Sequence, residues 1–402
     1  MNRISINTFI MSSGERYCLV IDKRNGMPLY YPNLYITTQI RNGGSSISTV
    51  ELVAGSISLL CNFFHERGID IEERIRLGTN LSINELDSLR DYTEKKVRLK
   101  RVIPYNVKKS SVVTTATKHF RLTNIANYLN WLIQILIPMS NNTAKQNQDF
   151  INKIKARRPK IKNQSVLSRE DRSLNEKQMK ILLEIIQVGS DKNPFDEDVQ
   201  VRNRLIILVL YSLGIRSGEL LNIRISDINF TDSSLAIRRR ADDKADPRVK
   251  QPLVKTMERK LPLSKQLVKE LHNFITKTRK DFKNAKKHEY LFLTHKSGPT
   301  QGKPLSAMAY HKIIDAIRNV DPELYKLTGH KLRHTWNYEF SKMLDRMTTP
   351  LNETEQADMR SALMGWVQGS DTAKIYNKRY IQDKANDVAI ALQEDINKKD
   401  KK

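Results

Sequence analysis

The stretch SLGIRSGELLNIRISDI, residues 212–228, contains the signals that organise the second half of the chain. It overlaps the apolar run QVRNRLIILVLYSL (200–213), which predicts a helix that ends at Gly214. Arg216 then opens the next predicted helix, beside backbone N–H groups that lack an intrahelical partner. A guanidinium and free N–H groups at one helix end suit a bound anion. The alternative is an ordinary surface pair between Arg216 and Glu219, three residues further on.

A second basic cluster, GHKLRHTW, occupies residues 329–336 and contains no acid. On a helix, His330, Arg333 and His334 share one face, because they are spaced i, i+3 and i+4. The alternatives are a solvated basic face, a buried core histidine, or a metal site made by His330 and His334. The positive charge of Lys331 and Arg333 disfavours a metal, so we expect neither a metal nor another cofactor.

The composition favours a polyanionic partner. With 402 residues the chain has room for two or three domains, and 39% hydrophobic and 28% charged residues fit a globular protein. Lys and Arg total 69 against 44 acids, which gives a net charge of +25 and a pI near 9.9. Such an excess suits nucleic acid or an anionic membrane surface.

A membrane partner is the weaker of these two options. Apolar runs such as LIILVLYSLGI (205–215) are shorter than the roughly 18–20 residues that span a bilayer. The first residues, MNRISINTFIMSSGERYC, lack the continuous apolar core of a signal peptide. Cys18 and Cys61 suit a reducing compartment. We therefore expect double-stranded DNA as the partner, no membrane, and a cytoplasmic location such as the bacterial cytoplasm or nucleoid.

Basic residues concentrate between Lys95 and Arg169, where 17 Lys and Arg face a single acid, Asp149. Basic clusters flank the helical pattern FRLTNIANYLNWLIQIL (120–136), which predicts a DNA-embracing helical module followed by a basic linker. The alternative is a solvated basic face. The residues that we expect on DNA are Lys95, Lys96, Arg98, Lys100, Arg101, Lys118, Arg121, Lys153, Lys155, Arg157, Arg158, Lys160 and Lys162.

Changes in pattern suggest the domain organisation. The expected parts are a strand-rich extension of unknown role (1–44), a helical DNA-binding domain (45–150), a basic linker (151–172), a catalytic domain (173–390) and a lysine-rich tail (391–402). The extension contains the strand-like pieces RYCLVI, PLYYP and LYITTQI. Residues 46–66 predict the first helix, S-L-N-E at 173–176 predicts a capping box, and 234–263 a small strand-rich insert.

The two clusters belong to a longer ordered set. SLGIRSGELLNIRISDI is followed by VKTMERKLPLS (254–264), HKLRHTW (330–336) and LMGWVQGSDTAKIY (363–376). This order resembles the tyrosine recombinase (phage integrase) family. That family shows an Arg in a G-[LI]-R-x-x-E-[LI] box, a β-hairpin Lys, an H-x-x-R box, a His or Trp after a Gly, and a nucleophilic Tyr. The resemblance covers roughly residues 45–390.

The resemblance implies a mainly α fold with a small β-sheet, made of a helical core-binding (SAM-like) domain and an α+β catalytic domain. It also implies metal- and ATP-independent cleavage and rejoining of DNA through a 3′-phosphotyrosine. The implied catalytic residues are Arg216, Lys255, His330, Arg333, Trp366 and Tyr376, with Glu219, Asp227 and His334 in support.

The implied roles follow from what each side chain can do. The arginines bind the non-bridging phosphate oxygens. His330 takes part in proton transfer with the tyrosine. Lys255 protonates the leaving 5′-oxygen, and Tyr376 attacks the phosphorus. Of the supporting residues, Glu219 would orient Arg216, and Asp227 would tie the helix end to the following turn.

Several assignments have rivals. Lys250 and Lys260 lie close to Lys255 in the predicted hairpin, which carries a charged stretch at 241–250. Trp366 stands where many relatives have histidine, and it donates a hydrogen bond but moves no proton. It is alternatively a core aromatic residue. Tyr376 follows it after ten residues, where the family more often has nine, so Tyr380 is a rival nucleophile.

We therefore expect a site-specific recombinase that acts as a homotetramer on two DNA sites through a Holliday junction. Accessory directionality or host factors are possible partners. A terminal helix near 385–392 would dock on a neighbouring protomer or pack in its own domain. The alternatives are a type IB topoisomerase and a DNA-binding regulator without catalysis.

Overall fold

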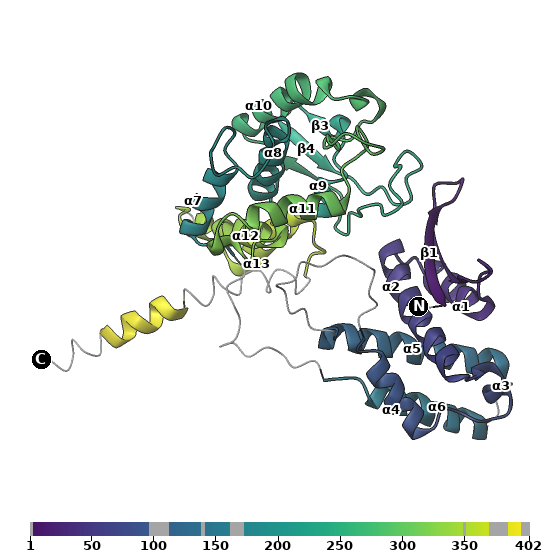
Figure 1. The fold of residues 1–402 in the computed structure, drawn as a ribbon. Helices are drawn as coiled ribbons and strands as arrows, with labels where there is room; N and C mark the ends of the chain where they lie inside the picture. Colours follow the sequence, from purple (N-terminus) through teal and green to yellow (C-terminus); the bar gives the residue numbers. More distant parts are fainter. Residues whose placement is uncertain are drawn as a thin grey trace, which may run out of the picture. The chain divides into compact units, whose positions relative to one another are not determined.

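The computed structural model describes residues 3–95, 112–137, 141–160, 173–348, 351–369 and 385–394. The chain divides into two compact units, unit 1 (Met1–Ser168) and unit 2 (Arg169–Lys402). Both are mostly helical, and each contains one small antiparallel sheet (Figure 1). The expected mainly α fold with little β structure is confirmed.

Unit 1 is a set of helices with a hairpin on one side. Strand β1 (Ile4–Ile10) pairs with β2 (Arg16–Asp22) in antiparallel register. The elements that follow are α1 (Tyr30–Tyr35), the π-helix η1 (Ile36–Arg41), α2 (Ile47–Arg67), α3 (Ile71–Arg76), α4 (Ile83–Tyr92), α5 (Thr115–Leu136) and α6 (Asn141–Ala156).

The strands expected at PLYYP and LYITTQI are wrong, because residues 30–41 are helical. Thr37 and Thr38 turn their hydroxyls back onto the carbonyls of Asn33 and Leu34, both at 2.8 Å. The Asn33 side chain in turn bonds both the N–H and the C=O of Val20, at 2.8 Å each. Tertiary contact with β2 thus overrides the strand preference of this aromatic and β-branched run.

The N-terminal hairpin belongs to the core of unit 1. Cys18 and Val20 of β2 are fully buried in the same apolar cluster as Ile57 and Leu60 of α2. Asn62 of α2 fastens β1, since its side chain accepts from the Ile4 N–H at 3.0 Å and donates to the Ile4 carbonyl at 2.8 Å. Residues 3–44 are therefore an integral part of the helical unit.

The predicted helix 46–66 is confirmed as α2, Ile47–Arg67. By length and composition α2 alone among the described residues could cross a membrane, a feature that the shorter apolar runs considered in the sequence did not show. However, 67% of its most apolar window is buried against the hairpin and the other helices. It therefore serves as the central core helix of unit 1.

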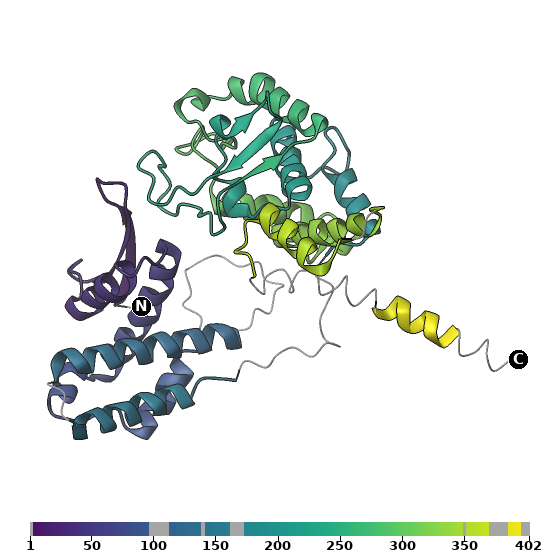
Figure 2. The same cartoon turned by 180° about the vertical axis from the view of Figure 1, so that it is seen from behind.

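Unit 2 surrounds the apolar helix α8, with the strands beside it (Figure 2). Its sheet has the order β3-β4-β5, all antiparallel. The elements are α7 (Glu176–Ile185), α8 (Glu197–Leu213), α9 (Ser217–Leu220), the 3₁₀ turn η3 (Ile225–Asp227), β3 (Ile228–Asn229), β4 (Ser234–Ile237), β5 (Arg259–Pro262), α10 (Lys265–Asn273), the π-helix η4 (Phe274–Thr278), the 3₁₀ turns η5 (Arg279–Asp281) and η6 (Ala285–Lys287), α11 (Ala307–Arg318), η7 (Pro322–Leu324), α12 (Gly329–Asp345) and α13 (Glu353–Met364).

Two boundary predictions need correction. The capping box lies two residues later than expected, because Asn175 and Gln178 exchange the bonds while Ser173 is buried. The expected linker begins too early, since α6 runs to Ala156 and buries Ile151 and Ile154 in the core of unit 1. In both cases burial of apolar or small side chains, which local polarity does not indicate, sets the boundary.

The Asn62 bonds to β1 generate a testable prediction. Asn62→Ala removes the side-chain acceptor of the buried Ile4 N–H, at a cost of about 1–3 kcal/mol, and leaves Ser58 Oγ, at 3.1 Å, as the side-chain donor to the Ile4 carbonyl. We expect a lower melting temperature and earlier proteolytic cleavage within residues 3–22. The matched control, Asn152→Ala at an exposed position of α6, should change neither. Equal melting of the two variants would show that the hairpin is dispensable to the core.

Candidate active site

The cluster GHKLRHTW forms the first two turns of α12. Thr328 caps this helix by accepting from the Lys331 N–H at 3.1 Å. His330 is exposed, whereas Arg333 is completely buried. The basic residues therefore lie on one helix, as their spacing predicts, but His330 and Arg333 differ sharply in their exposure to solvent.

Arg333 ties together three segments of unit 2. Its Nη1 donates to the Gly214 carbonyl at 2.7 Å, and its Nη2 donates to the Met364 carbonyl at 3.2 Å. Its guanidinium lies 5.4 Å from the centroid of the buried Trp366 ring. The ends of α8 and α13 are thus held to the second turn of α12.

Arg216 follows Gly214, which ends α8 in the left-handed conformation with φ of 60°. Arg216 caps the four-residue helix α9, and Glu219 closes that turn by accepting from the Arg216 N–H at 3.0 Å. The Arg216 side chain keeps 30% of its surface exposed, and its Nη1 lies 3.9 Å from Glu219 Oε1. The expected pair with Glu219 exists, but at this distance it is weak.

Glu219 is almost fully buried, and its short bonds go to residues that the sequence analysis missed. Arg259 Nη2 donates to Glu219 Oε2 at 2.9 Å, and Thr256 Oγ1 donates to Oε1 at 2.5 Å. Arg259 also donates from Nε to the Leu363 carbonyl at 2.6 Å. No sequence signal distinguishes Arg259 from the exposed basic residues around it, because only the folded chain shows which arginine points inward.

The backbone of the segment just before β5 is hydrogen-bonded to the end of α13. The Met257 N–H donates to the Gly365 carbonyl at 2.9 Å. Gly365 has φ of 66°, and a Cβ there would come within 2.7 Å of Arg259 Nη1 and 2.8 Å of the Met257 carbonyl. Only glycine fits between α13 and this segment.

The three candidate lysines differ in their surroundings. Lys255 is exposed and immediately precedes Thr256, so it adjoins the Glu219 network. Lys260 lies on β5 and its Nζ pairs with Asp232 at 3.1 Å. Lys250 is exposed within the long connection between β4 and β5. Lys255 thus immediately precedes a residue bonded to Glu219, whereas the Lys260 ammonium group is already paired with a carboxylate.

Asp227 and His334 occupy buried supporting positions. Asp227 accepts from both Nη atoms of Arg240, at 2.5 and 3.1 Å, and from the Arg224 N–H at 2.9 Å. It therefore anchors the turn after α9 to the start of the long β4–β5 connection.

The rings of His334 and His330 meet edge to face with centroids 4.8 Å apart. Within the described residues, no group of three or more His, Cys, Asp and Glu side chains could hold a metal ion.

Burial and the arginines act on Glu219 in opposite directions. Burial alone would raise the pKa of its carboxyl group, but Arg259, Thr256 and Arg333 together lower the pKa below its usual value. Glu219 therefore stays charged, and its negative charge lies among buried guanidinium groups. Loss of one partner from such a buried ion pair is strongly destabilising, because it leaves the other charge buried without compensation.

The two candidate nucleophiles, Tyr376 and Tyr380, lie outside the described residues, as do Lys96, Arg98, Lys100, Arg101 and Lys162. The structure therefore places the predicted basic and supporting side chains of unit 2, but neither tyrosine.

In unit 1, several residues that we expected on DNA are bonded within the unit. Arg157 pairs with Asp87 at 2.8 Å, and Lys118 pairs with Glu94. Arg121 donates to the carbonyls of Thr93 and Lys95 at 2.7 and 2.9 Å, and burial lowers its pKa. Arg158 donates to the Lys155 carbonyl at 3.0 Å. Lys95, Lys153 and Lys160 remain exposed.

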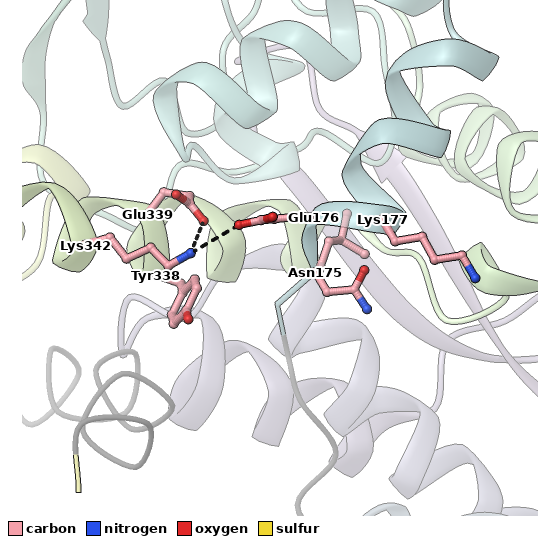
Figure 3. A pocket seen from close by; sticks show the side chains of 7 residues that line it. Asn175, Glu176, Lys177, Tyr338, Glu339 and Lys342 are labelled. Atoms are coloured by element: carbon pink, nitrogen blue, oxygen red, sulfur yellow. Dashed lines mark ion pairs between the residues drawn. The ribbon is translucent and has the colours of Figure 1, made fainter. Parts of the chain in front are cut away.

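A shallow pocket of about 350 Å³ lies between the start of α7 and the middle of α12 (Figure 3). Lys342 spans it, with its Nζ 3.8 Å from Glu176 and 3.6 Å from Glu339. None of the predicted site residues lines this pocket. Its lining contains two lysines and two glutamates, whose charges balance, so the pocket does not suit an anion.

The sequence that forms α8, α9, α12 and α13 lies within a range that matches a known protein family. Residues 172–382 match the model of the phage integrase family, and this range is more than half of the chain. The chain belongs to the phage integrase family. The matched range includes every catalytic residue that the sequence analysis named.

One curated relative is similar to this chain over a range that exceeds unit 2 and therefore includes part of unit 1. Transposase A from transposon Tn554 of Staphylococcus aureus is 24% identical over 327 residues, or 79% of this chain and 81% of the relative. The tyrosine recombinase XerA of Pyrococcus furiosus is 28% identical over 44% of this chain and 50% of its own length.

The fold of this phage integrase also matches a solved structure. The XerH site-specific recombinase, bound to its difH substrate in a pre-cleavage complex, has a TM-score of 0.50 and 18% identity. The match covers 86% of this chain and 80% of that one. At this identity the likeness concerns the fold alone, and it supports the expected pair of helical and α+β units.

The Glu219 network predicts a pH-dependent loss of stability. Glu219→Gln removes the charge that neutralises Arg259, and breaking a buried pair costs about 3–5 kcal/mol at neutral pH. Because the folded protein lowers the pKa of Glu219, its stabilising effect is full above the unfolded-state pKa of about 4.3 and is lost as the pH falls further. Urea unfolding from neutral to acidic pH should show the two proteins converging.

The control for this prediction is Glu184→Gln, an exposed residue that pairs with Lys192 and should have little effect at any pH. A stability difference that stays constant down to acidic pH would contradict an ionised Glu219.

Proposed function

We propose that this chain is a site-specific DNA recombinase that cuts and rejoins DNA through a covalent tyrosine intermediate. The observation that carries the proposal is the Glu219 network. It joins Arg216, Thr256 and Arg259, and Lys255 precedes Thr256 in the chain. The Arg333 guanidinium lies against Trp366, and all these residues fall within the range that matches the family. A site with this much fixed positive charge suits a phosphate that gains negative charge in its transition state.

In the proposed reaction, the Tyr376 phenol gives its proton to His330, its oxygen attacks the scissile phosphorus, and the bond from phosphorus to the 5′-oxygen breaks. The leaving oxygen takes a proton from the Lys255 ammonium, and the 3′ end of the cut strand becomes a phosphotyrosine. Rejoining reverses these steps, with a 5′-hydroxyl from the partner strand as the nucleophile. The phosphotyrosine conserves the energy of the bond, so no ATP is needed, and in this proposal Arg216, Arg333 and Lys255 supply the positive charge that a metal ion would otherwise provide.

The two arginines have unequal positions. Arg216 is partly exposed and free to meet a non-bridging oxygen directly. Arg333 already donates to the Gly214 and Met364 carbonyls, so it holds the positive charge at the base of the site. Because Arg333 is fully buried, a phosphate would reach its guanidinium only after a neighbouring segment moved.

His330 and Trp366 complete the proposed site from different directions. His330 is exposed on the first turn of α12 and is the residue there able to accept or give a proton at neutral pH. Trp366 is buried against Arg333, Met364 and Trp336, so it packs as a core aromatic as well as offering an indole N–H. We therefore assign proton transfer to His330 and positioning to Trp366.

Assembly as a tetramer on two DNA sites is part of the same proposal, with strands exchanged through a Holliday junction. The helical segment 385–394 supports it, because Val388, Ile390 and Leu392 all expose more than half of their surface. Val388 and Leu392, spaced i and i+4, share one face of this helix, and such an exposed apolar face suits a neighbouring protomer. Binding of DNA follows from the net charge of +25 and the exposed basic residues of unit 1.

Two other functions make different predictions. A type IB topoisomerase would relax supercoiled DNA as a monomer, without pairing two sites. A DNA-binding regulator would bind without forming a covalent complex. The relatives named as transposase and as tyrosine recombinase favour recombination.

Covalent trapping tests the nucleophile. With a nicked duplex from DNA flanking its own gene and no Mg²⁺, we expect a protein–DNA band on a denaturing gel. Tyr376→Phe should abolish this band because no phenol oxygen remains to attack, whereas Tyr380→Phe should keep it. Loss of the band only in Tyr380→Phe would move the nucleophile by one helical turn. Tight binding with no band in the unaltered chain would favour the regulator.

The proposed acid is tested by changing the leaving group. Lys255→Ala should slow cleavage of ordinary DNA by about 10²–10⁴-fold, the usual contribution of general acid catalysis. A bridging sulfur in place of the 5′-oxygen leaves as a thiolate without needing a proton, so this substrate should restore the rate. Lys260→Ala, which removes the partner of Asp232, is the control and should show no such rescue. Rescue of Lys260→Ala instead would reassign the acid.

A further inference from the structure

Residues 279–303 of unit 2 form a small lobe with its own apolar cluster, made by Ala285, Tyr290, Leu293 and Phe282. We refer to it as the lysine lobe. Arg279 organises it from inside, because its Nε and Nη2 donate to the Tyr290 carbonyl at 3.1 and 2.9 Å and Nη2 to the His288 carbonyl at 2.5 Å. The sequence analysis singled out no residue of this segment.

The turns of the lobe are packed against one another. The rings of Phe282 and His295 stack with centroids 3.3 Å apart. A Cβ on Gly302 would lie 2.5 Å from the Lys283 carbonyl, which shows how closely the last turn approaches the first. His295 is buried, and burial together with the nearby arginines lowers its pKa to about 3, so it adds no charge of its own.

This packing gathers lysines that are distant in sequence. Lys283 follows Phe282, Lys296 follows His295, and Lys303 follows Gly302, so the three stand at adjoining turns. They are exposed, as are the other lysines of the lobe, Lys280, Lys286 and Lys287. Seven basic residues of the lobe face only two acids, Asp281 and Glu289.

Among the described residues, some exposed lysines elsewhere in unit 2 are paired with acids, as the lobe lysines are not. Lys177, Lys192 and Lys260 pair with Glu323, Glu184 and Asp232 at 2.8, 2.9 and 3.1 Å. In the part of the chain that the structure describes, no lobe lysine has a carboxylate oxygen within 4.0 Å of its ammonium nitrogen. An ordinary solvated face would mix both signs of charge along its length.

The lobe is fastened to the segment that leaves α9. The Leu291 N–H donates to the Ile223 carbonyl and the Ile225 N–H to the Glu289 carbonyl, both at 2.8 Å. The Arg224 guanidinium lies 5.1 Å from the Tyr290 ring centroid. The lysines are therefore carried at a fixed place relative to Arg216, within the same unit.

We propose that the lysine lobe is a second DNA-binding surface, which holds the phosphate backbone of the duplex away from the scissile phosphate. The inference rests on the proposed function for its choice of polyanion. Ammonium groups on flexible stems contact phosphates as point charges and read no base. The lobe thus adds affinity and register to the complex but no sequence specificity.

The salt dependence of binding to a random-sequence duplex tests the lobe without knowledge of the target site. The variant is Lys283→Gln, Lys296→Gln and Lys303→Gln together, measured by fluorescence anisotropy over a salt series. Removing one lysine from a phosphate reduces the slope of log affinity against log salt by about 0.9, so a reduction of about 2–3 is expected. The slope of the unaltered protein is the reference.

Two controls separate specific contact from net charge and from folding. Lys177→Gln, Lys192→Gln and Lys342→Gln together remove the same charge from lysines paired with carboxylates, and should leave the slope unchanged. Arginine at the three lobe positions should also keep it. Should the glutamine variant melt early, the three single substitutions are measured instead, each with an expected reduction of up to about 0.9.

A lobe variant whose slope equals that of the paired-lysine control overturns the proposal, because the lysines are then merely solvated. The outcome is separate from that of the recombinase proposal. If the unaltered chain forms no covalent complex yet the lobe variant has a smaller slope, the lobe binds DNA and the catalytic proposal fails. If trapping succeeds and the slope is unchanged, the catalytic proposal stands and the lobe proposal fails.

Discussion

The buried carboxylate of Glu219 is the contact on which the rest of unit 2 depends. It receives Arg259 and Thr256 from the segment before and within β5, and the backbone of Arg216 from the turn after α8. A charge taken out of water needs close partners, and the partners here come from two segments that are about 40 residues apart in the chain. The same carboxylate therefore folds the unit and brings its basic side chains into one place.

The local punctuation of the fold was predictable from the sequence. Gly214 ends α8 as expected, and the spacing of His330, Arg333 and His334 did form one helix. These features depend on residues within one or two turns, so the pattern contains all the information needed. The order of the family motifs, which needs no geometry at all, identified the family correctly.

What escaped prediction depends on contacts between distant residues. Residues 30–41 look like strands, and they are helical because Asn33 reaches across to Val20. Arg259 and Arg279 look like surface residues, and both are buried because carbonyls and a carboxylate from other segments receive them. A linear pattern states how polar a side chain is, but not which way the folded chain turns it.

The attachment of the N-terminal hairpin to α2 has a consequence for the history of this protein. A segment that shares a core helix with its neighbour does not travel between proteins as a separate module, because its removal strips one side of that core. A related chain without residues 3–22 would need another cover for Ile57 and Leu60 and other partners for Asn62. Transfer of the helical unit without its hairpin would therefore expose a fully buried apolar surface of α2 to water.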